Sequence, residues 1–358
     1  MRGLREVSVG LETSARSSQS PRLRAPRAAL TRGGPGAERD VREGGRWSRW
    51  QRLKNDALFF LARVALGAVR PLGARGLAAL GRALGRLVHA AAWPLRARAR
   101  RNLGRAMPAL GRRERDALAR ASFVALGEHV GEVVASLREA TTPLPFDEAS
   151  RSLLREALAE GRGVVLPSAH LGPWERLAAT LVAAGFPLTA IVRESYDPRF
   201  DGIVGAARRR AALETIPRGA PGAATRIVRV LRAGRVLGVP MDLRTRAASI
   251  PAPFFGRPAQ TAVGPARLAL RTGAAVVVCT VERHPEARGL AVTCTRLPIA
   301  HVRDEVALTA LINAELERRV RTAPELWLWM HDRWDTHQED AASPGRSCAP
   351  EEVVTRTP

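Results

Sequence analysis

A histidine and a glutamate stand five residues apart in the segment SAHLGPWE, and both side chains suit proton transfer. An imidazole accepts a proton from a hydroxyl near neutral pH, and a carboxylate can fix its tautomer and stabilise the imidazolium that forms. The intervening Gly-Pro turn lets the carboxylate of Glu175 fold back towards His170. The pair predicts a general base, although a histidine followed by a glutamate at this spacing also occurs in purely structural roles.

The nucleophile in this chemistry is expected to come from outside the protein. The chain contains no G-x-S-x-G nucleophile elbow, and Ser168 lies two residues before His170 without such a context. The histidine is therefore better interpreted as activating an incoming hydroxyl than as activating a serine of the protein.

The segment lies where a buried strand gives way to a helix, and ligands bind at this edge of open α/β sheets. Unbroken apolar runs predict strands at 163–167, 187–192, 235–240 and 274–281, with helices between them at 174–184, 198–212, 222–233 and 262–272. The run 289–295 follows closely enough to pair antiparallel with 274–281. We therefore predict an α/β fold, an α-β-α sandwich with a largely parallel mixed sheet, preceded by N-terminal membrane-interacting helices.

Changes in composition along the chain predict a division into four segments. Basic, apolar-faced helices at 49–92 predict association with a membrane interface, although packing over the protein's own core, or one helix docked and one in lipid, would give the same pattern. The predicted organisation is a disordered basic extension at 1–48, these amphipathic helices at 49–92, a catalytic domain at 93–336 and a disordered tail at 337–358.

The formal net charge of +23 requires anionic partners such as phosphate headgroups, nucleic acid or an acidic protein. Aromatic residues make up only 4% of the chain and no nucleic-acid-binding motif appears, so we expect no nucleic acid partner. The three cysteines have no paired spacing, which argues against a metal site or a disulfide scaffold. No apolar run reaches the length of a clean transmembrane helix.

SAHLGPWE resembles the H-x4-D/E motif as it occurs in the bacterial lipid A biosynthesis late acyltransferase family. Further segments resemble that family's motifs in the same order, over roughly residues 56–335: RRNLGRAMP (100–108), IVRESYDP (191–198), the block 238–277 that contains PFFGRPAQT, and PELWLWMHDRW (324–334). Two departures are Met107 where the family has Phe, and VPMDLRT where glycerol-phosphate acyltransferases carry P-E-G-T-R. The second departure argues against a glycerophospholipid acceptor.

The resemblance implies transfer of a fatty acyl chain from an acyl-carrier-protein thioester to a hydroxyl of an anionic glycolipid. It places this reaction among phospholipids at the cytoplasmic face of the bacterial inner membrane, with no cofactor and no metal. By this resemblance His170 is the general base, Glu175 is the charge-relay carboxylate, and Arg193 binds a phosphate or the thioester carbonyl. The backbone N–H groups of the 171–174 turn are a second candidate for stabilising the oxyanion.

The remaining substrate-side residues come from the same matched segments. Asp242 has no derived role: it could orient His170 or Arg193, or cap a helix. The phenylalanines are expected to line or close an acyl channel, with core packing as the alternative. The residues assigned to substrate binding, beside Arg193, are Asp242, Gly172, Trp174, Phe254, Phe255 and Gly256.

Three alternatives stay open from the sequence. Within the family, the donor could be acyl-CoA and the acceptor a phosphatidylinositol mannoside or another membrane lipid. A basic nucleic-acid-binding protein would belong to a different class. A catalytically inactive, membrane-anchored family member is the third, although His170 and Glu175 are both present.

Overall fold

The computed structural model describes residues 46–245, 247–284 and 289–334. Of the predicted basic extension at 1–48, only residues 46–48 fall within these ranges, and the predicted tail at 337–358 lies outside them. The prediction that these two segments are disordered therefore concerns residues that are not described.

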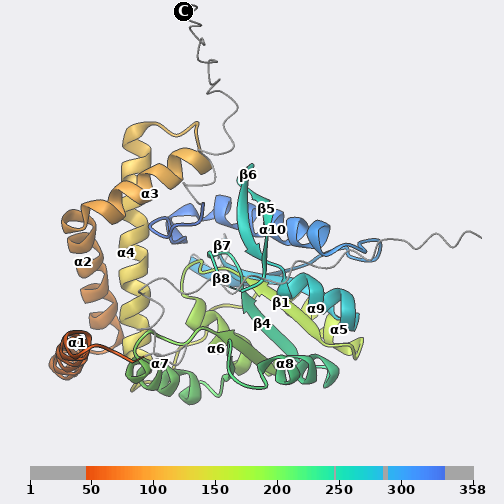
Figure 1. The fold of residues 1–358 in the computed structure, drawn as a ribbon, viewed down its shortest axis with the longest axis horizontal. Helices are drawn as coiled ribbons and strands as arrows, with labels where there is room; N and C mark the ends of the chain where they lie inside the picture. The colour runs from red at the N-terminus through yellow and green to blue at the C-terminus, as the bar shows by residue number, and fades with distance from the viewer. Residues whose placement is uncertain (1–45, 246, 285–288, 335–358) are drawn as a thin grey trace, which may run out of the picture. The chain divides into compact units, whose positions relative to one another are not determined.

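A six-stranded sheet runs through the molecule in the order β3-β2-β4-β1-β7-β8 (Figure 1). All neighbouring strands pair parallel except β7 and β8, which form an antiparallel hairpin. This confirms the predicted largely parallel mixed sheet. The strands are β1 (Val164–Ser168), β2 (Leu188–Val192), β3 (Glu214–Pro217), β4 (Val236–Pro240), β7 (Ala275–His284) and β8 (Gly289–Arg296).

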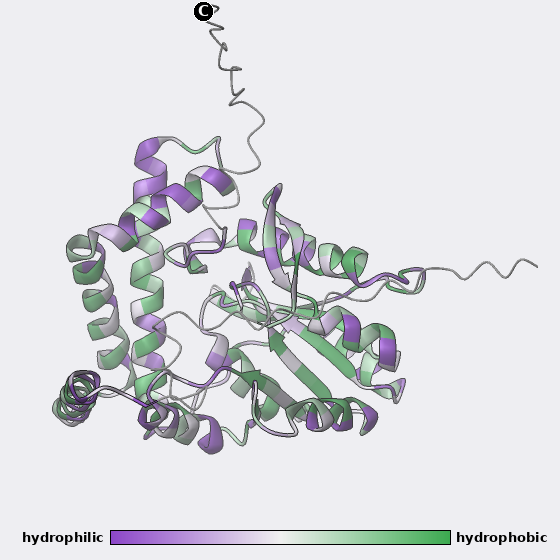
Figure 2. Cartoon of the chain, in the orientation of Figure 1, coloured by the Kyte–Doolittle hydropathy of each residue, from purple (hydrophilic) through white to green (hydrophobic). Residues whose placement is uncertain are grey.

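Successive side chains of a strand point to opposite faces, so a sheet with a helical layer on each side buries both sets. Val165 of β1 faces a core shared with α8 (Ala223–Arg232), α9 (Gly264–Thr272) and α10 (Glu305–Thr322), whereas Val164 faces a core shared with α5 (Glu148–Ala159) and α6 (Trp174–Ala183). The strands are accordingly coloured mostly as hydrophobic in Figure 2. The sheet is thus the middle layer of the predicted α-β-α sandwich.

Several elements were absent from the sequence prediction. They are the short edge strand β3, helix α5, the Arg-rich helix α3 (Trp93–Ala106), and a separate antiparallel hairpin made of β5 (Ser249–Phe254) and β6 (Arg257–Ala262). Phe255 and Gly256 form the two-residue turn of that hairpin, with φ of +53° and +68°. Two consecutive positive φ values are what the right-handed twist of a tight hairpin requires.

Glycines bring α2 (Ala74–Ala91) and α4 (Arg112–Ser136) into backbone contact, side by side in Figure 1. A Cβ added at Gly81 would lie 2.1 Å from the carbonyl oxygen of Gly127, and one at Gly85 would lie 2.3 Å from that of Phe123. Gly131 approaches the carbonyl oxygen of Leu77 equally closely. On α2, the leucine next to this contact, Leu77, is buried, whereas Leu84 and Leu87 are exposed.

We expect Gly127→Ala to lower the free energy of unfolding by about 1–3 kcal/mol, because the new methyl group forces the two backbones apart. Gly202 of α7 (Pro198–Arg210) is a matched control, since a Cβ there meets nothing within 4 Å. Alanine is the better helix former by up to about 1 kcal/mol, so Gly202→Ala is expected to raise the same quantity. Urea unfolding of both variants tests the opposite signs, and equal behaviour would contradict the close packing.

The amino-terminal helix α1 (Arg49–Ala68) docks on α7 with one side only. Asp56 forms an ion pair with Arg199 at 2.7 Å, and the Arg199 guanidinium lies 4.7 Å from the ring centre of Phe59. The other side of α1 and one side of α2 expose large apolar residues, namely Trp50, Leu53, Leu58, Phe60, Leu61, Val64, Leu84, Leu87 and Val88. Within the described ranges, none of the helices is both long and apolar enough to cross a membrane.

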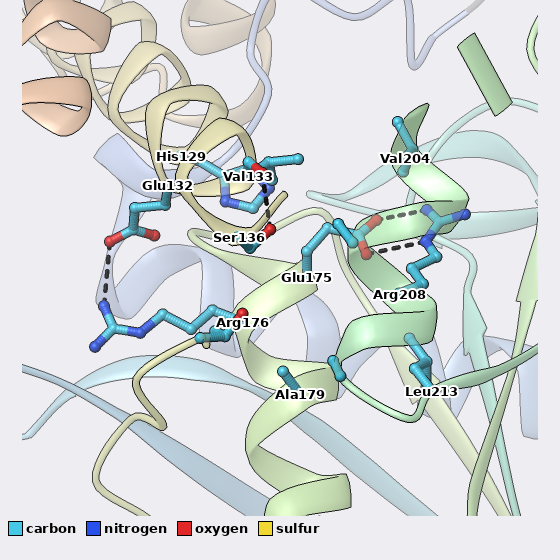
Figure 3. A pocket seen from close by; sticks show the side chains of 13 residues that line it. His129, Glu132, Val133, Ser136, Glu175, Arg176, Ala179, Val204, Arg208 and Leu213 are labelled. Carbon is cyan, nitrogen blue, oxygen red and sulfur yellow. Dashed lines mark hydrogen bonds and ion pairs between the residues drawn. The ribbon is translucent and has the colours of Figure 1, made fainter. Parts of the chain in front are cut away.

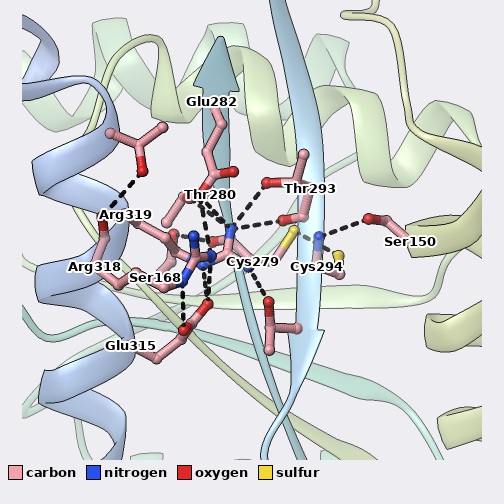
Figure 4. A network of polar contacts seen from close by, with 12 residues as sticks. Ser150, Ser168, Cys279, Thr280, Glu282, Thr293, Cys294, Glu315, Arg318 and Arg319 are labelled. Carbon is pink, nitrogen blue, oxygen red and sulfur yellow. Dashed lines mark hydrogen bonds and ion pairs between the residues drawn. The ribbon is translucent and has the colours of Figure 1, made fainter. Parts of the chain in front are cut away.

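A buried arginine fastens α10 to the β7–β8 hairpin (Figure 4). Arg319 is 1% exposed and donates hydrogen bonds to Thr280, Thr293 and Thr295 on the two strands and to Glu315 on its own helix. A buried cation is tolerated only when its donors are satisfied and an anion is near. The three threonines of the strands therefore accept the hydrogen bonds that hold α10 against the hairpin.

Candidate active site

The chain reverses direction just after β1, and His170 stands in the reversal before α6 begins. Strand β4 lies next to β1 and parallel to it, with Ser168 opposite Pro240. Asp242 follows β4 as His170 follows β1, so the two side chains emerge at the same carboxyl edge of the sheet. The strand order therefore brings together two residues that the sequence separates by 72 positions.

Asp242 holds His170 through two contacts. Its Oδ1 lies 2.8 Å from Nδ1 of the imidazole, and its Oδ2 accepts the backbone N–H of His170 at 2.9 Å. The indole N–H of Trp327 donates to the same Oδ2 at 2.8 Å. A carboxylate can only accept, so the proton of the neutral imidazole belongs on Nδ1. Nε2 is then the basic nitrogen, and within the described ranges it has no hydrogen-bond partner.

The charges at this pair reinforce one another. Burial alone would raise the pKa of the fully buried Asp242 carboxyl, but the imidazole charge of His170 and the hydrogen bonds from His170 and Trp327 outweigh it, and the pKa lies below the usual value. Burial likewise acts to lower the pKa of His170, yet the Asp242 charge and hydrogen bond, with a smaller effect of Glu175, raise it above 6.5. Asp242 thus stays ionised and makes His170 a stronger base.

Glu175, predicted to be the relay carboxylate, points elsewhere. Both of its oxygens accept from the guanidinium of Arg208 on α7, at 3.0 and 2.5 Å (Figure 3). It begins the first turn of α6, and that helix directs the carboxylate towards α7 instead of back across the Gly-Pro turn. The structure thus places Asp242, and not Glu175, on Nδ1 of His170, while the charge-relay role of Glu175 stays a prediction. Glu175 still acts on His170 through its charge.

Two backbone N–H groups of the turn between β1 and α6 donate hydrogen bonds to carbonyl oxygens of the protein. The N–H of Gly172 donates to the carbonyl oxygen of Leu326 at 3.0 Å, and that of Trp174 donates to the carbonyl oxygen of Gly172 at 3.0 Å. Pro173 has no N–H. Gly172 has φ of +61°, a backbone conformation that L side chains rarely adopt, so glycine suits this position. These contacts engage the N–H groups of Gly172 and Trp174, and the role of the turn as an oxyanion site stays a prediction.

Arg193 follows β2 directly, at the same carboxyl edge of the sheet, and its side chain is exposed. No contact between Arg193 and His170 or Asp242 occurs in the structure. Because β4 separates β2 from β1, Arg193 lies one strand further from His170 than Asp242 does. Its predicted role in binding substrate stays a prediction.

Phe254 and Phe255 are 0% and 5% exposed, and they pack edge-on against each other with ring centres 5.0 Å apart. Phe254 also contacts Trp327 and Trp334. The rings therefore belong to the aromatic core, which was the alternative to an acyl channel. Gly256, beside them, completes the hairpin turn.

The closing segment 324–334, which resembles a family motif but was assigned no role from the sequence, contributes Trp327 to the site. Besides Trp327, it is fixed by Asn102, whose amide donates to the carbonyl oxygens of Trp329 and His331 at 2.9 and 2.7 Å. Asn102 comes from the RRNLGRAMP segment, so two motifs far apart in the sequence meet here. The sequence did not distinguish Trp327 from the neighbouring tryptophans. The one available signal was general: a buried indole N–H needs a hydrogen-bond acceptor.

Across the part of the chain that the structure describes, no three His, Cys, Asp or Glu side chains are arranged to hold a metal ion. A carboxylate-oriented imidazole with a free Nε2 performs proton transfer by itself. The arrangement can therefore deprotonate a hydroxyl that approaches from the open side of His170, whose side chain is 26% exposed.

The sequence matches one family model, described as bacterial lipid A biosynthesis acyltransferase, over residues 48–336. The match begins at the start of α1 and ends just after the closing segment, and it includes both His170 and Asp242. No curated protein matches the chain.

Proposed function

The chain belongs to the bacterial lipid A biosynthesis acyltransferase family, and on that premise we propose that it transfers a fatty acyl chain from a thioester donor to a hydroxyl of a lipid A precursor or a similar glycolipid. The observation that carries the proposal is the contact of 2.8 Å between Asp242 and Nδ1 of His170, which leaves Nε2 basic and accessible. Acyl transfer to a hydroxyl needs a base in that state.

The proposed step is direct. Nε2 of His170 takes the hydroxyl proton while the oxygen attacks the thioester carbonyl, and the Asp242 carboxylate stabilises the imidazolium. When the tetrahedral intermediate collapses, the new ester C–O bond remains and the C–S bond breaks. The proton then passes from His170 to the departing thiolate, which restores the neutral imidazole. Arg193, a planar cation at the same edge of the sheet, is the proposed group for binding substrate phosphate or the carbonyl oxygen.

We propose acyl carrier protein as the donor's carrier, since a chain of net charge +23 favours an acidic protein. Exposed arginines such as Arg101, Arg112 and Arg113 lie on α3 and the start of α4 without an ion-pair partner in the described ranges, and they suit either that carrier or anionic lipid headgroups. Acyl-CoA is also anionic and is the alternative donor.

The exposed apolar sides of α1 and α2 support a peripheral position on the cytoplasmic face of the inner membrane. Basic helices with one apolar side lie in the plane of a membrane interface, with their cationic side chains at the headgroups. Trp50 and Trp93, 74% and 68% exposed, are aromatic residues of the kind found at that depth. A phospholipid surface would cover these side chains while keeping the glycolipid acceptor close to His170.

One experiment tests donor, acceptor and membrane position together. The purified full-length chain is added to anionic vesicles that carry a lipid A precursor or a phosphatidylinositol mannoside, with radiolabelled acyl carrier protein thioester or acyl-CoA. We expect co-sedimentation with the vesicles and label in the lipid A precursor from the carrier-protein thioester. Label in the mannoside from acyl-CoA would select the alternative, and no label in either lipid would contradict the proposed function.

A further inference from the structure

A second histidine lies buried beside the site and has no part in the mechanism above. His129 of α4 is 4% exposed and lines a pocket between α4, α6 and α7, together with Glu132, Arg176, Glu175 and Arg208 (Figure 3). Two ion pairs flank this pocket, Glu132 with Arg176 and Glu175 with Arg208. His129 thus occupies a polar environment without taking part in either pair.

The rings of His129, Trp174 and His170 contact one another in that order, from α4 to the base. The ring centres of His129 and Trp174 are 4.0 Å apart, and those of Trp174 and His170 are 5.0 Å apart with an angle of 69° between the ring planes. Trp174 is the first residue of α6, and its indole contacts the imidazole of His170 in the preceding turn. Contacts between aromatic rings at these separations favour defined relative orientations.

His129 is neutral at the pH at which His170 works. Burial lowers the pKa of His129 to about 4, and the Glu175 charge only partly opposes this. Its Nδ1 is buried without a hydrogen-bond partner in the described part of the chain. A positive charge at this position would lower the basicity of His170, because like charges disfavour protonation of a neighbour. A ring that stays uncharged can support Trp174 without that penalty.

We propose that His129 is a positioning residue: its neutral ring holds Trp174 against His170, so that the imidazole keeps Nδ1 on Asp242. The role is mechanical and acts through Trp174, since no contact between His129 and the reacting atoms exists. It also links the site to the amino-terminal helices, because the backbone contacts of Gly127 and Gly131 with α2 lie on either side of His129 on α4. This inference rests on the proposed function, in which His170 is the base.

The test compares His129→Leu, which removes the ring, with His129→Phe, which keeps an uncharged ring. For His129→Leu we expect kcat to fall about 10–100-fold with KM nearly unchanged, as for a misplaced catalytic group. We also expect the pKa of His170, followed by NMR of the imidazole C–H protons, to fall towards the ordinary value of about 6.5, since the Asp242 contact that raises it is loosened. His129→Phe should keep both quantities near those of the wild type.

Trp174→Leu supplies a second route, because it removes the middle ring from a partly exposed position and should lower the His170 pKa in the same way. Once Trp174 is absent, adding His129→Leu should change kcat no further, which a double-mutant cycle measures. If folded His129→Leu leaves kcat and the His170 pKa unchanged, or if His129→Phe is as impaired as His129→Leu, the positioning role is overturned. The NMR titration needs no turnover, so it tests this inference even if the proposed acyl transfer fails.

Discussion

Replacing His170 by alanine is expected to lower kcat for acyl transfer by about 10²–10⁴-fold, the usual contribution of a general base. The substitution removes Nε2, the basic nitrogen that faces the substrate side, and leaves the Asp242 carboxylate without its imidazole. Binding of the thioester is expected to change less, because KM then reports contacts made elsewhere. Radiolabel transfer to the lipid acceptor under single-turnover conditions measures the effect.

The matched control for His170→Ala is His284→Ala, since His284 at the end of β7 pairs with Asp147 and contacts neither His170 nor Asp242 within the described residues. His284→Ala should show the thermal unfolding midpoint of the wild type, whereas His170→Ala should unfold at a lower temperature, because it leaves the buried Asp242 carboxylate without its imidazole partner. A folded His170→Ala protein that turns over at the wild-type rate would remove His170 from the mechanism.

The second large effect is expected for Asp242→Asn, again about 10²–10⁴-fold in kcat. Two N–H groups, from the His170 backbone and the Trp327 indole, point at the Oδ2 position. An asparagine there would turn its oxygen towards these donors and its NH₂ group towards Nδ1 of His170. Nδ1 would then have to accept, the proton would move to Nε2, and the base would be held in the wrong tautomer.

The pH profile of kcat/KM distinguishes this effect of Asp242→Asn on His170 from a general loss of structure. His170 must be neutral to act, so kcat/KM falls as the pH drops through its pKa, which lies above 6.5 in the wild type. In Asp242→Asn the raising influence of the carboxylate is lost while burial still lowers the pKa. The acidic limb of the profile should therefore move to lower pH, and the plateau should fall.

Glu175→Gln is the comparison for Asp242→Asn. Its charge has the smaller effect on the His170 pKa and its oxygens are engaged with Arg208, so a loss within about tenfold is expected. If Glu175→Gln were the more damaging substitution, Asp242 would not be the carboxylate that supports the base.

Much of this architecture could be predicted because its signals are local. The strand 163–167 needed only an apolar run between turn residues, and β1 was found at Val164–Ser168. The glycines at 185, 234 and 273, where helix ends were expected, all have positive φ. The missed hairpin β5–β6 contains Pro251 and Pro253, which argue against a strand by themselves and are tolerated here because the hairpin stands apart from the main sheet.

The site was harder because its decisive contact is not local. His170 was identified from its motif, and the motif also suggested Glu175 as its partner. Which carboxylate reaches Nδ1 depends on β4 lying next to β1, and strand order cannot be computed from the composition of either strand. Phe254 and Phe255 show the same limit, since an FF pair has the same sequence whether it lines a channel or meets three tryptophans in the core.

The indole of Trp327 has a consequence for how the molecule is made. Asp242 and His170 are both synthesised before this indole, which comes 85 residues after Asp242. Until the ribosome has delivered the closing segment, the carboxylate lacks one of its donors, and a buried anion with an unmet acceptor is costly. The catalytic pair therefore acquires its final setting late in synthesis.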